Sequence, residues 1–97
     1  MNFDKKCYEL LAKVPKGKVV TYKDIAKSLD SKAYRAVGNA MNRNKNAPSV
    51  PCHRVINSSG SVGGYAFGVD NKIKILKEEG VEIVNGKVDL EKYGLKL

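Results

Sequence analysis

Cysteine and histidine are scarce in this 97-residue chain, which contains two cysteines and one histidine. Cys7 and Cys52 could form at most one disulfide bond, far fewer than small secreted scaffolds use, so we expect reduced thiols. With one histidine and no CxxC pair, the ligands of a structural zinc site are missing. A chain of this length forms one small domain, which excludes large cofactor folds. We therefore expect no metal and no cofactor.

Long apolar runs are also missing. No stretch approaches the roughly 20 apolar residues that span a bilayer, and the first four residues lack the apolar core of a signal peptide. We expect a soluble intracellular protein without membrane contact, cytoplasmic or, in a eukaryote, nuclear.

Positive charge is abundant, because 18 lysines and arginines against 10 aspartates and glutamates give a formal net charge of +8. Such an excess attracts polyanions, and nucleic acid is the first partner to consider. The alternative is a lysine-rich surface that serves only solubility.

Helical patterns dominate the first half. Asn2 is a candidate cap for a helix that carries apolar residues from Phe3 to Val14, and a short strand over 18–20 follows. Thr21 begins a second helix, and Ser31 is a candidate cap for a third that ends near Arg43. Two short helices joined by a tight turn predict a helix-turn-helix at about 22–43. Such pairs also occur in domains that bind no DNA, but here the outward side chains are largely polar or basic.

The second half contains a long polar segment, 44–64, of the kind that is often functional in a small domain. Asp70 is a candidate cap for a last helix that ends between Lys77 and Glu79, and Asn85-Gly86 predicts a hairpin over 81–90. The expected fold is α+β and mostly helical, a single domain over 1–97 with a winged helix-turn-helix character.

Cys52 is the candidate nucleophile, because a thiolate is reactive at neutral pH and an imidazole such as that of His53 can take its proton. Neighbours in a regular strand point to opposite faces, so the pair can cooperate only if the backbone turns sharply, as Pro51 permits, or a third group bridges them. The alternative is that Cys52 is a small buried hydrophobe.

The segment Pro51-Cys52-His53-Arg54-Val55 is highly specific. With Arg35-Ala36-Val37-Gly38 before it, and Ser59-Gly60 and Gly64-Tyr65 after it, it resembles the methylated-DNA protein-cysteine methyltransferases, the 6-O-alkylguanine-DNA alkyltransferases. The likeness runs from about Phe3 to Gly80 and corresponds to the catalytic C-terminal domain, without the amino-terminal domain that most members carry. It implies a monomer that binds the minor groove of double-stranded DNA, extrudes the alkylated guanine and transfers its 6-O-alkyl group irreversibly to cysteine.

The resemblance implies a role for each matching residue. Cys52 is the alkyl acceptor, His53 the base that acts through a water, Glu79 its carboxylate partner and Asn44 the hinge asparagine. Tyr22 contacts the flipped nucleotide, and Arg35 fills the vacated place in the base stack. The remaining matches are helix residues that face DNA (Ala36, Asn39 and Arg43) and pocket residues (Met41, Val55, Tyr65, Ala66 and Lys72).

The sequence departs from the family pattern at two positions. Lys45-Asn46 stands where a proline often follows the hinge asparagine, and Phe67 stands where a small residue is common, which predicts a pocket narrowed towards methyl adducts. The family also has short relatives that bind alkylated DNA without repairing it and carry tryptophan or alanine at the reactive position. A non-catalytic protein that recruits other repair factors is therefore the alternative function.

Overall fold

The computed structural model describes residues 3–32, 34–44, 50–65 and 67–95. Three features expected from the sequence lie outside these residues: the Asn2 cap, the Lys45-Asn46 departure and the pocket residue Ala66.

Three helices form the amino-terminal half: α1 (Phe3–Leu11), α2 (Tyr22–Ser28) and α3 (Tyr34–Asn42). The expectation that α1 reaches Val14 was wrong, because Pro15 disfavours helical backbone at Val14. The amide of Val14 instead donates to the Leu11 carbonyl at 2.9 Å, which tightens the end of the helix. The Val14 side chain is still buried.

Ser31, the expected cap of the third helix, directly follows the residue that ends α2, and its capping role stays a prediction because residue 33 lies outside the described residues. Asp30 has a φ of 54°, and the Ser31 amide donates to the Ala26 carbonyl at 2.9 Å. This left-handed residue and the long backward hydrogen bond form a Schellman motif that ends α2. The backbone of Ser31 therefore serves the preceding helix, and α3 begins at Tyr34.

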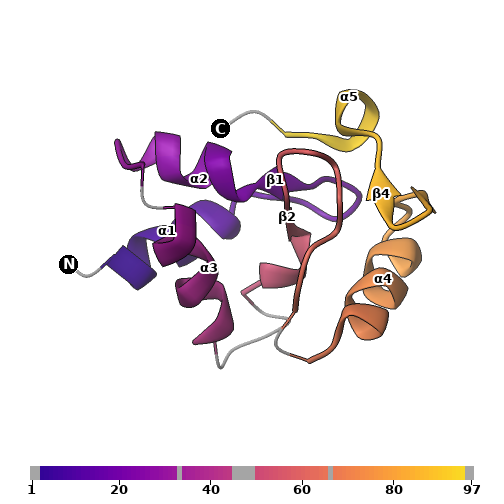
Figure 1. Cartoon of the computed structure of the whole chain (residues 1–97), viewed down its shortest axis with the longest axis horizontal. Coiled ribbons are helices and arrows are strands. Elements are labelled where there is room, and N and C mark those ends of the chain that lie inside the picture. Colours follow the sequence, from indigo (N-terminus) through magenta and orange to yellow (C-terminus); the bar gives the residue numbers. More distant parts are fainter. Residues whose placement is uncertain (1–2, 33, 45–49, 66, 96–97) are drawn as a thin grey trace.

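Two short strands pair in parallel across the middle of the molecule: β1 (Val20–Thr21) and β2 (Val55–Ile56), with Val20 opposite Val55 and Thr21 opposite Ile56. Side chains of a strand alternate between faces. Val20 and Val55 accordingly join the hydrophobic cluster of α1, α2 and α3, whereas Ile56 joins a second cluster with Leu76 of α4. The strand pair thus separates two small cores, with α1 to α3 on one side and α4 on the other (Figure 1).

The carboxy-terminal half contains α4 (Val69–Glu78), the hairpin strands β3 (Ile83–Val84) and β4 (Lys87–Val88), and α5 (Leu90–Tyr93). The predicted hairpin is confirmed, and its turn residues Asn85 and Gly86 have φ values of 53° and 73°. Asp70 does not cap α4, because Gly68 occupies that position and Asp70 lies in the first turn. The sequence analysis did not predict α5 or the β1–β2 pairing.

The predicted α+β fold class is confirmed, with about half of the chain helical and the helix-turn-helix formed by α2 and α3. None of the helices in the described part of the chain has the length and apolar character needed to cross a membrane.

The start of α2 provides a stability test, because the Thr21 hydroxyl accepts a hydrogen bond from the Asp24 amide at 3.0 Å. Thr21→Ala should lower the free energy of unfolding by about 1 kcal/mol relative to Thr21→Ser, since both lose the methyl group and only alanine loses the cap. Urea denaturation of the two variants measures the difference. Equal midpoints would show that the cap does not stabilise the helix.

Candidate active site and nucleic-acid interface

The segment Pro51-Cys52-His53-Arg54 makes a sharp turn directly before β2. Residues Cys52–Arg54 form a short 3₁₀ helix, η1, in which the Arg54 amide donates to the Pro51 carbonyl at 3.0 Å. Cys52 and His53 are 4% and 1% exposed, so both side chains are inside the protein. The turn that allows these neighbours to cooperate, expected at Pro51, is therefore present.

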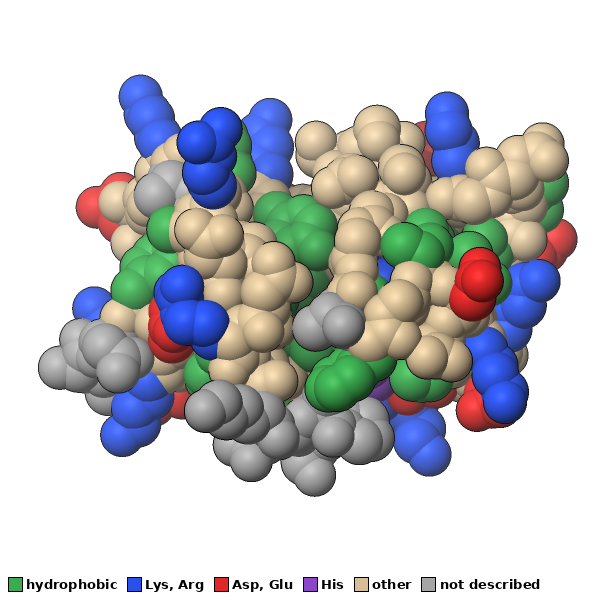
Figure 2. All heavy atoms as spheres, turned by 60° about the horizontal axis from the view of Figure 1, so that its bottom comes forward, with side chains coloured by type: hydrophobic (Ala, Val, Ile, Leu, Met, Phe, Trp, Pro, Cys, Tyr) green, Lys and Arg blue, Asp and Glu red, His purple; other side chains and the backbone are tan. Residues whose placement is uncertain are grey.

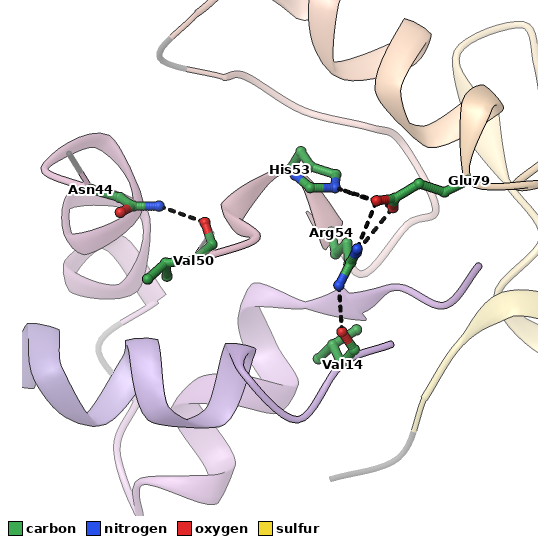
Figure 3. Close-up of polar contacts among 6 residues, drawn as sticks. All are labelled: Val14, Asn44, Val50, His53, Arg54 and Glu79. Atoms are coloured by element: carbon green, nitrogen blue, oxygen red, sulfur yellow. Dashed lines mark hydrogen bonds and ion pairs between the residues drawn. The ribbon is translucent and has the colours of Figure 1, made fainter. Parts of the chain in front are cut away.

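His53 is joined to Glu79, the residue that ends α4 (Figure 3). Its Nε2 lies 3.1 Å from each carboxylate oxygen of Glu79. Arg54 approaches the same carboxylate, with Nε 2.9 Å from Oε1 and Nη2 2.6 Å from Oε2. Its Nη1 donates to the Val14 carbonyl at 2.6 Å. One carboxylate thus receives both the imidazole and the guanidinium.

The charges of this cluster follow from burial and pairing. Burial alone would raise the pKa of the Glu79 carboxyl, but hydrogen bonds from Arg54 and His53 outweigh it and hold the pKa below the ordinary value. Burial also lowers the pKa of His53, and the hydrogen bond and charge of Glu79 only partly oppose this. At neutral pH the site therefore contains an ionised carboxylate and a neutral imidazole.

The neutral imidazole has one tautomer that fits its surroundings. An ionised carboxylate only accepts hydrogen bonds, so the proton of His53 must lie on Nε2, which faces Glu79. Nδ1 then carries a lone pair. It is buried and has no hydrogen-bond partner within the described residues. Nδ1 is therefore the nitrogen of this imidazole that can accept a hydrogen bond or a proton.

Asn44 links the end of α3 to this turn. The side chain is buried, and its Nδ2 donates to the Val50 carbonyl at 2.8 Å (Figure 3). The amide of Cys52 donates to the same carbonyl at 2.8 Å. Asn44 thus contacts the residue whose carbonyl also accepts from the first amide of η1, and its role as a hinge stays a prediction.

Lys72 and two tyrosines lie around the cysteine. Lys72 of α4 is fully buried, and its Nζ donates to the carbonyls of Val55 at 2.7 Å and Gly64 at 3.1 Å. Burial lowers its pKa to about 8, and attraction to Cys52 opposes part of that shift. The Lys72 ammonium also lies 5.9 Å from the centre of the Tyr22 ring. Lys72 therefore connects α4, β2 and the start of α2.

Burial raises the pKa of both Tyr22 and Tyr65, and Cys52 adds to each shift. Both hydroxyls are therefore protonated at neutral pH and close enough to sense the charge of the cysteine. Phe67 packs edge-on against Tyr65, with ring centres 5.5 Å apart, and is 54% exposed. Its ring lies at the surface beside Tyr65, and the expected narrowing of the pocket by Phe67 stays a prediction.

The remaining predicted pocket residues, Met41 and Val55, are buried in the same hydrophobic cluster as Cys52. The amide of Val55 donates to the Cys52 carbonyl, and its carbonyl accepts from Lys72. Both polar groups of this backbone unit have protein partners, so recognition of a base by Val55 stays a prediction.

A cavity of about 540 Å³ separates the helix-turn-helix from the loop that follows β2. Tyr22, Arg35 and Gly38 line one side, and Asn57–Ser59 line the other, with Lys23 and Tyr34 completing the wall. Figure 2 shows lysine and arginine side chains around the margin of one face and hydrophobic side chains nearer its middle. Tyr22 lines this cavity together with the basic residues Lys23 and Arg35, and it also lies within electrostatic range of Cys52.

The other predicted DNA-facing residues differ in their surroundings. Asn39 is exposed, and Ala36 is half-buried. The Arg43 guanidinium is exposed but donates twice to Asp4 of α1, from Nε and Nη2 at 2.7 Å each. That pair joins α1 to the end of α3 and uses two donors that a phosphate would otherwise take.

The sequence analysis did not assign Arg54 to the site, although the residue lies within the signature pentapeptide. The adjacent cysteine and histidine are typical catalytic residues, whereas an arginine is usually an exposed charged residue. In the structure Arg54 directly precedes the buried strand β2, and its side chain is only 12% exposed.

Comparison with known proteins gives a consistent result. Residues 2–81 match the family model described as "6-O-methylguanine DNA methyltransferase, DNA binding domain", a range that includes η1 and Glu79. The bifunctional methyltransferase/endonuclease of Picrophilus torridus is 48% identical over 89% of this chain and 29% of its own length. The methylated-DNA–protein-cysteine methyltransferase of Methanosarcina barkeri is 49% identical over 80% of this chain and 50% of its own length.

Among solved structures, S. pombe Atl1 in complex with damaged DNA containing O6-carboxymethylguanine superposes with a TM-score of 0.87 and 36% identity. That match covers 98% of this chain and 95% of Atl1. The chain spans about half or less of the length of the two methyltransferase relatives.

Burial of neutral His53 predicts a pH-dependent stability. Its folded-state pKa lies below 6.5, so in acid the unfolded chain binds a proton that the folded protein resists. The free energy of unfolding should therefore fall as the pH decreases from 7 through about 6. Glu79, whose folded pKa lies below 4.5, adds a further loss only at lower pH.

Urea denaturation between pH 8 and pH 5 tests this, with His53→Gln as the comparison, because glutamine does not titrate. The variant should lose less stability than the wild type over that interval. Parallel curves for the two proteins would mean that His53 is not the group responsible.

Proposed function

The chain belongs to the family of the 6-O-methylguanine DNA methyltransferase DNA-binding domain, and from this premise we propose that it repairs alkylated guanine in double-stranded DNA. Cys52 accepts the 6-O-alkyl group, foremost methyl, in one irreversible turnover, without metal or cofactor. The observation that carries the proposal is the buried, neutral His53, paired with Glu79 through Nε2 and unpaired at Nδ1 among the described residues, next to Cys52.

These groups suit the activation of a thiol. Nδ1 of His53 takes the Cys52 proton through a water, and the imidazolium that forms is stabilised by the ionised Glu79. The nearby Lys72 ammonium attracts the thiolate. Asn44 holds the backbone from which Cys52 projects.

Transfer then proceeds by displacement at the alkyl carbon. The sulfur–carbon bond forms as the carbon–oxygen bond to guanine breaks, and the electron pair of that bond stays with the base. Tyr22, whose hydroxyl is protonated, donates a proton to the guanine edge. Tyr22 then regains a proton from the His53 imidazolium. The net change moves the thiol proton to guanine and the alkyl group to sulfur.

DNA binding rests on the excess positive charge and on the helix-turn-helix. Relatives of this fold have been crystallised with DNA, including Atl1 with an O6-carboxymethylguanine lesion. We propose that α3 enters the minor groove, that Arg35 replaces the extruded guanine, and that Ala36, Asn39 and Arg43 contact the duplex. The extruded base passes Tyr22 into a pocket walled by Met41, Val55, Tyr65, Ala66 and Lys72, and the protein acts as a monomer.

A second function is a damage sensor that binds alkylated DNA without transfer and recruits other repair factors. The match over 95% of Atl1 favours this alternative, because there the likeness extends over almost the whole partner chain. The presence of Cys52 beside the His53–Glu79 pair favours the transferase, because a sensor has no need for a thiol there.

Transfer to Cys52 is tested by mass spectrometry after incubation with a duplex that contains 6-O-methylguanine. We expect one methyl group per molecule, on the peptide that contains Cys52, and product that plateaus at the amount of active protein. The reason is that a thioether has no easy path to release the methyl group. Cys52→Ser should abolish transfer but retain binding to the modified duplex, because a serine hydroxyl is too weak an acid.

Cys7→Ala is the matched control. Cys7 is fully buried in α1, and burial raises its pKa to about 11, so its thiol is not an acceptor. This variant should transfer like the wild type. Tight binding of methylated DNA by the wild type with no mass change on Cys52 would replace the transferase by the sensor.

The proposed role of Arg35 predicts a difference between substrates. Arg35→Ala should slow repair of duplex DNA by roughly tenfold or more but barely change reaction with the free modified base, which requires no extrusion. Single-turnover rates on the two substrates measure the difference.

Lys27→Ala provides a control for loss of charge, because Lys27 is an exposed residue of α2 that does not line the cavity. It should weaken duplex binding slightly, with more effect at low salt. Equal rate losses on both substrates for Arg35→Ala would exclude the proposed insertion into the base stack.

A further inference from the structure

We propose that Arg54 is a positioning residue of this site, which holds the Glu79 carboxylate against His53 and thereby fixes the imidazole with its proton on Nε2 and its lone pair on Nδ1. The catalytic consequence rests on the proposed function. The positioning itself is a property of the fold and can be measured without DNA.

The contacts of Arg54 restrict Glu79 at both oxygens. Nε and Nη2 donate to separate carboxylate oxygens at 2.9 and 2.6 Å, which is the paired geometry that arginine and carboxylate adopt in strong ion pairs. Both side chains are nearly buried, with exposures of 12% for Arg54 and 9% for Glu79. The carboxylate can therefore turn or tilt only if both hydrogen bonds break.

The guanidinium is itself held from the other side. Nη1 donates to the carbonyl of Val14, in the segment that leaves α1 ahead of Pro15 (Figure 3). Arg54 thus connects three parts of the chain: the exit of α1, η1 and the end of α4. Lysine has one donor centre and cannot span these acceptors in a plane, so the requirement is for arginine and not merely for a cation.

Fixing Glu79 fixes His53. Nε2 is equidistant from the two oxygens, at 3.1 Å, so the imidazole donates to the carboxylate as a whole and depends on its orientation. A carboxylate free to rotate would pair less well with Nε2, and the proton could then move to Nδ1. That tautomer would present a donor where the relay needs an acceptor.

Arg54 also affects the charge of His53. The charged groups that act on the imidazole are Glu79 and Lys72, both from α4, and Arg54 from its own turn. Glu79 favours the imidazolium, whereas Arg54 and Lys72 disfavour it and, with burial, lower the His53 pKa. Arg54 therefore lets His53 keep a carboxylate partner and still be neutral before reaction.

The experiment uses the fact that His53 is the only histidine in the sequence. Nitrogen-15 NMR of the imidazole reports its tautomer and its titration without ambiguity. In the wild type we expect the Nε2-protonated tautomer. In Arg54→Gln we expect a mixture of tautomers, because the Glu79 carboxylate is no longer held in one orientation. We also expect titration at higher pH, because a cation that disfavours the imidazolium is lost. An unchanged tautomer and titration in Arg54→Gln would overturn the proposal.

Arg54→Lys covers the case in which Arg54→Gln does not fold. Lysine keeps the positive charge but cannot make the two-donor contact with Glu79. We therefore expect mixed tautomers of His53 and a His53 titration closer to that of the wild type. A single Nε2-protonated tautomer in Arg54→Lys would also overturn the proposal.

Arg43→Gln is the matched control, because Arg43 makes a similar two-donor contact with Asp4 at the surface. It should leave the His53 spectrum unchanged.

Single-turnover transfer by the wild type and the Arg54 variants separates the two proposals. If the wild type methylates Cys52, the rate at pH 7 should fall roughly tenfold in Arg54→Gln, a part of what a general base contributes. Its dependence on pH should move in the same direction as the His53 titration. If the wild type transfers nothing, the proposed function fails, and the NMR result still decides the role of Arg54.

Discussion

The parallel pairing of β1 with β2 is the constraint on which the rest of the site depends. Each strand has only two residues, yet the register of Val20 with Val55 and Thr21 with Ile56 determines what lies at either end. Tyr22 follows β1 and Asn57 follows β2, so both residues line the same cavity. At the other end of β2, η1 presents Cys52 and His53. A slip of one residue would exchange the faces of the strand and place Val55 in the wrong core.

So short a pairing needs support from outside the strands, and buried charges provide much of it. Arg54 connects η1 to Glu79 and Val14, and Lys72 donates to the Val55 carbonyl of β2 and to Gly64. Burying a charge is unfavourable unless it is paired and hydrogen-bonded. Here the partners are the carbonyls of Val14, Val55 and Gly64 and the carboxylate of Glu79. The charged groups that suit the chemistry are therefore also the groups that hold the site together.

Much of the site could be predicted because its chemistry is local in sequence. Pro51-Cys52-His53 gives a candidate nucleophile, a candidate base and a turn within three residues. The Thr21 cap locates the start of α2, and Asn85-Gly86 locates the hairpin. Contacts between distant residues could not be predicted in this way. The pairing of Arg54 with Glu79, the insertion of Lys72 beneath β2 and the contact of Arg43 with Asp4 join residues that are 8 to 39 positions apart. No periodicity or spacing encodes such contacts, because they arise only when the cores assemble.

The two cysteines illustrate why the fold alone does not decide the function. Cys7 and Cys52 are buried in one hydrophobic cluster, and by burial alone they would be equivalent. Their polar neighbours differ. Cys7 has the carboxylate of Asp4 nearby, which adds to the effect of burial in keeping the thiol protonated. Cys52 instead has the Lys72 ammonium and two tyrosine hydroxyls within electrostatic range, and the imidazole of His53 is the next residue. Replacement of Cys52 alone would leave the cavity and the His53–Glu79–Arg54 cluster without a change of sequence and would remove the thiol that we propose as the alkyl acceptor.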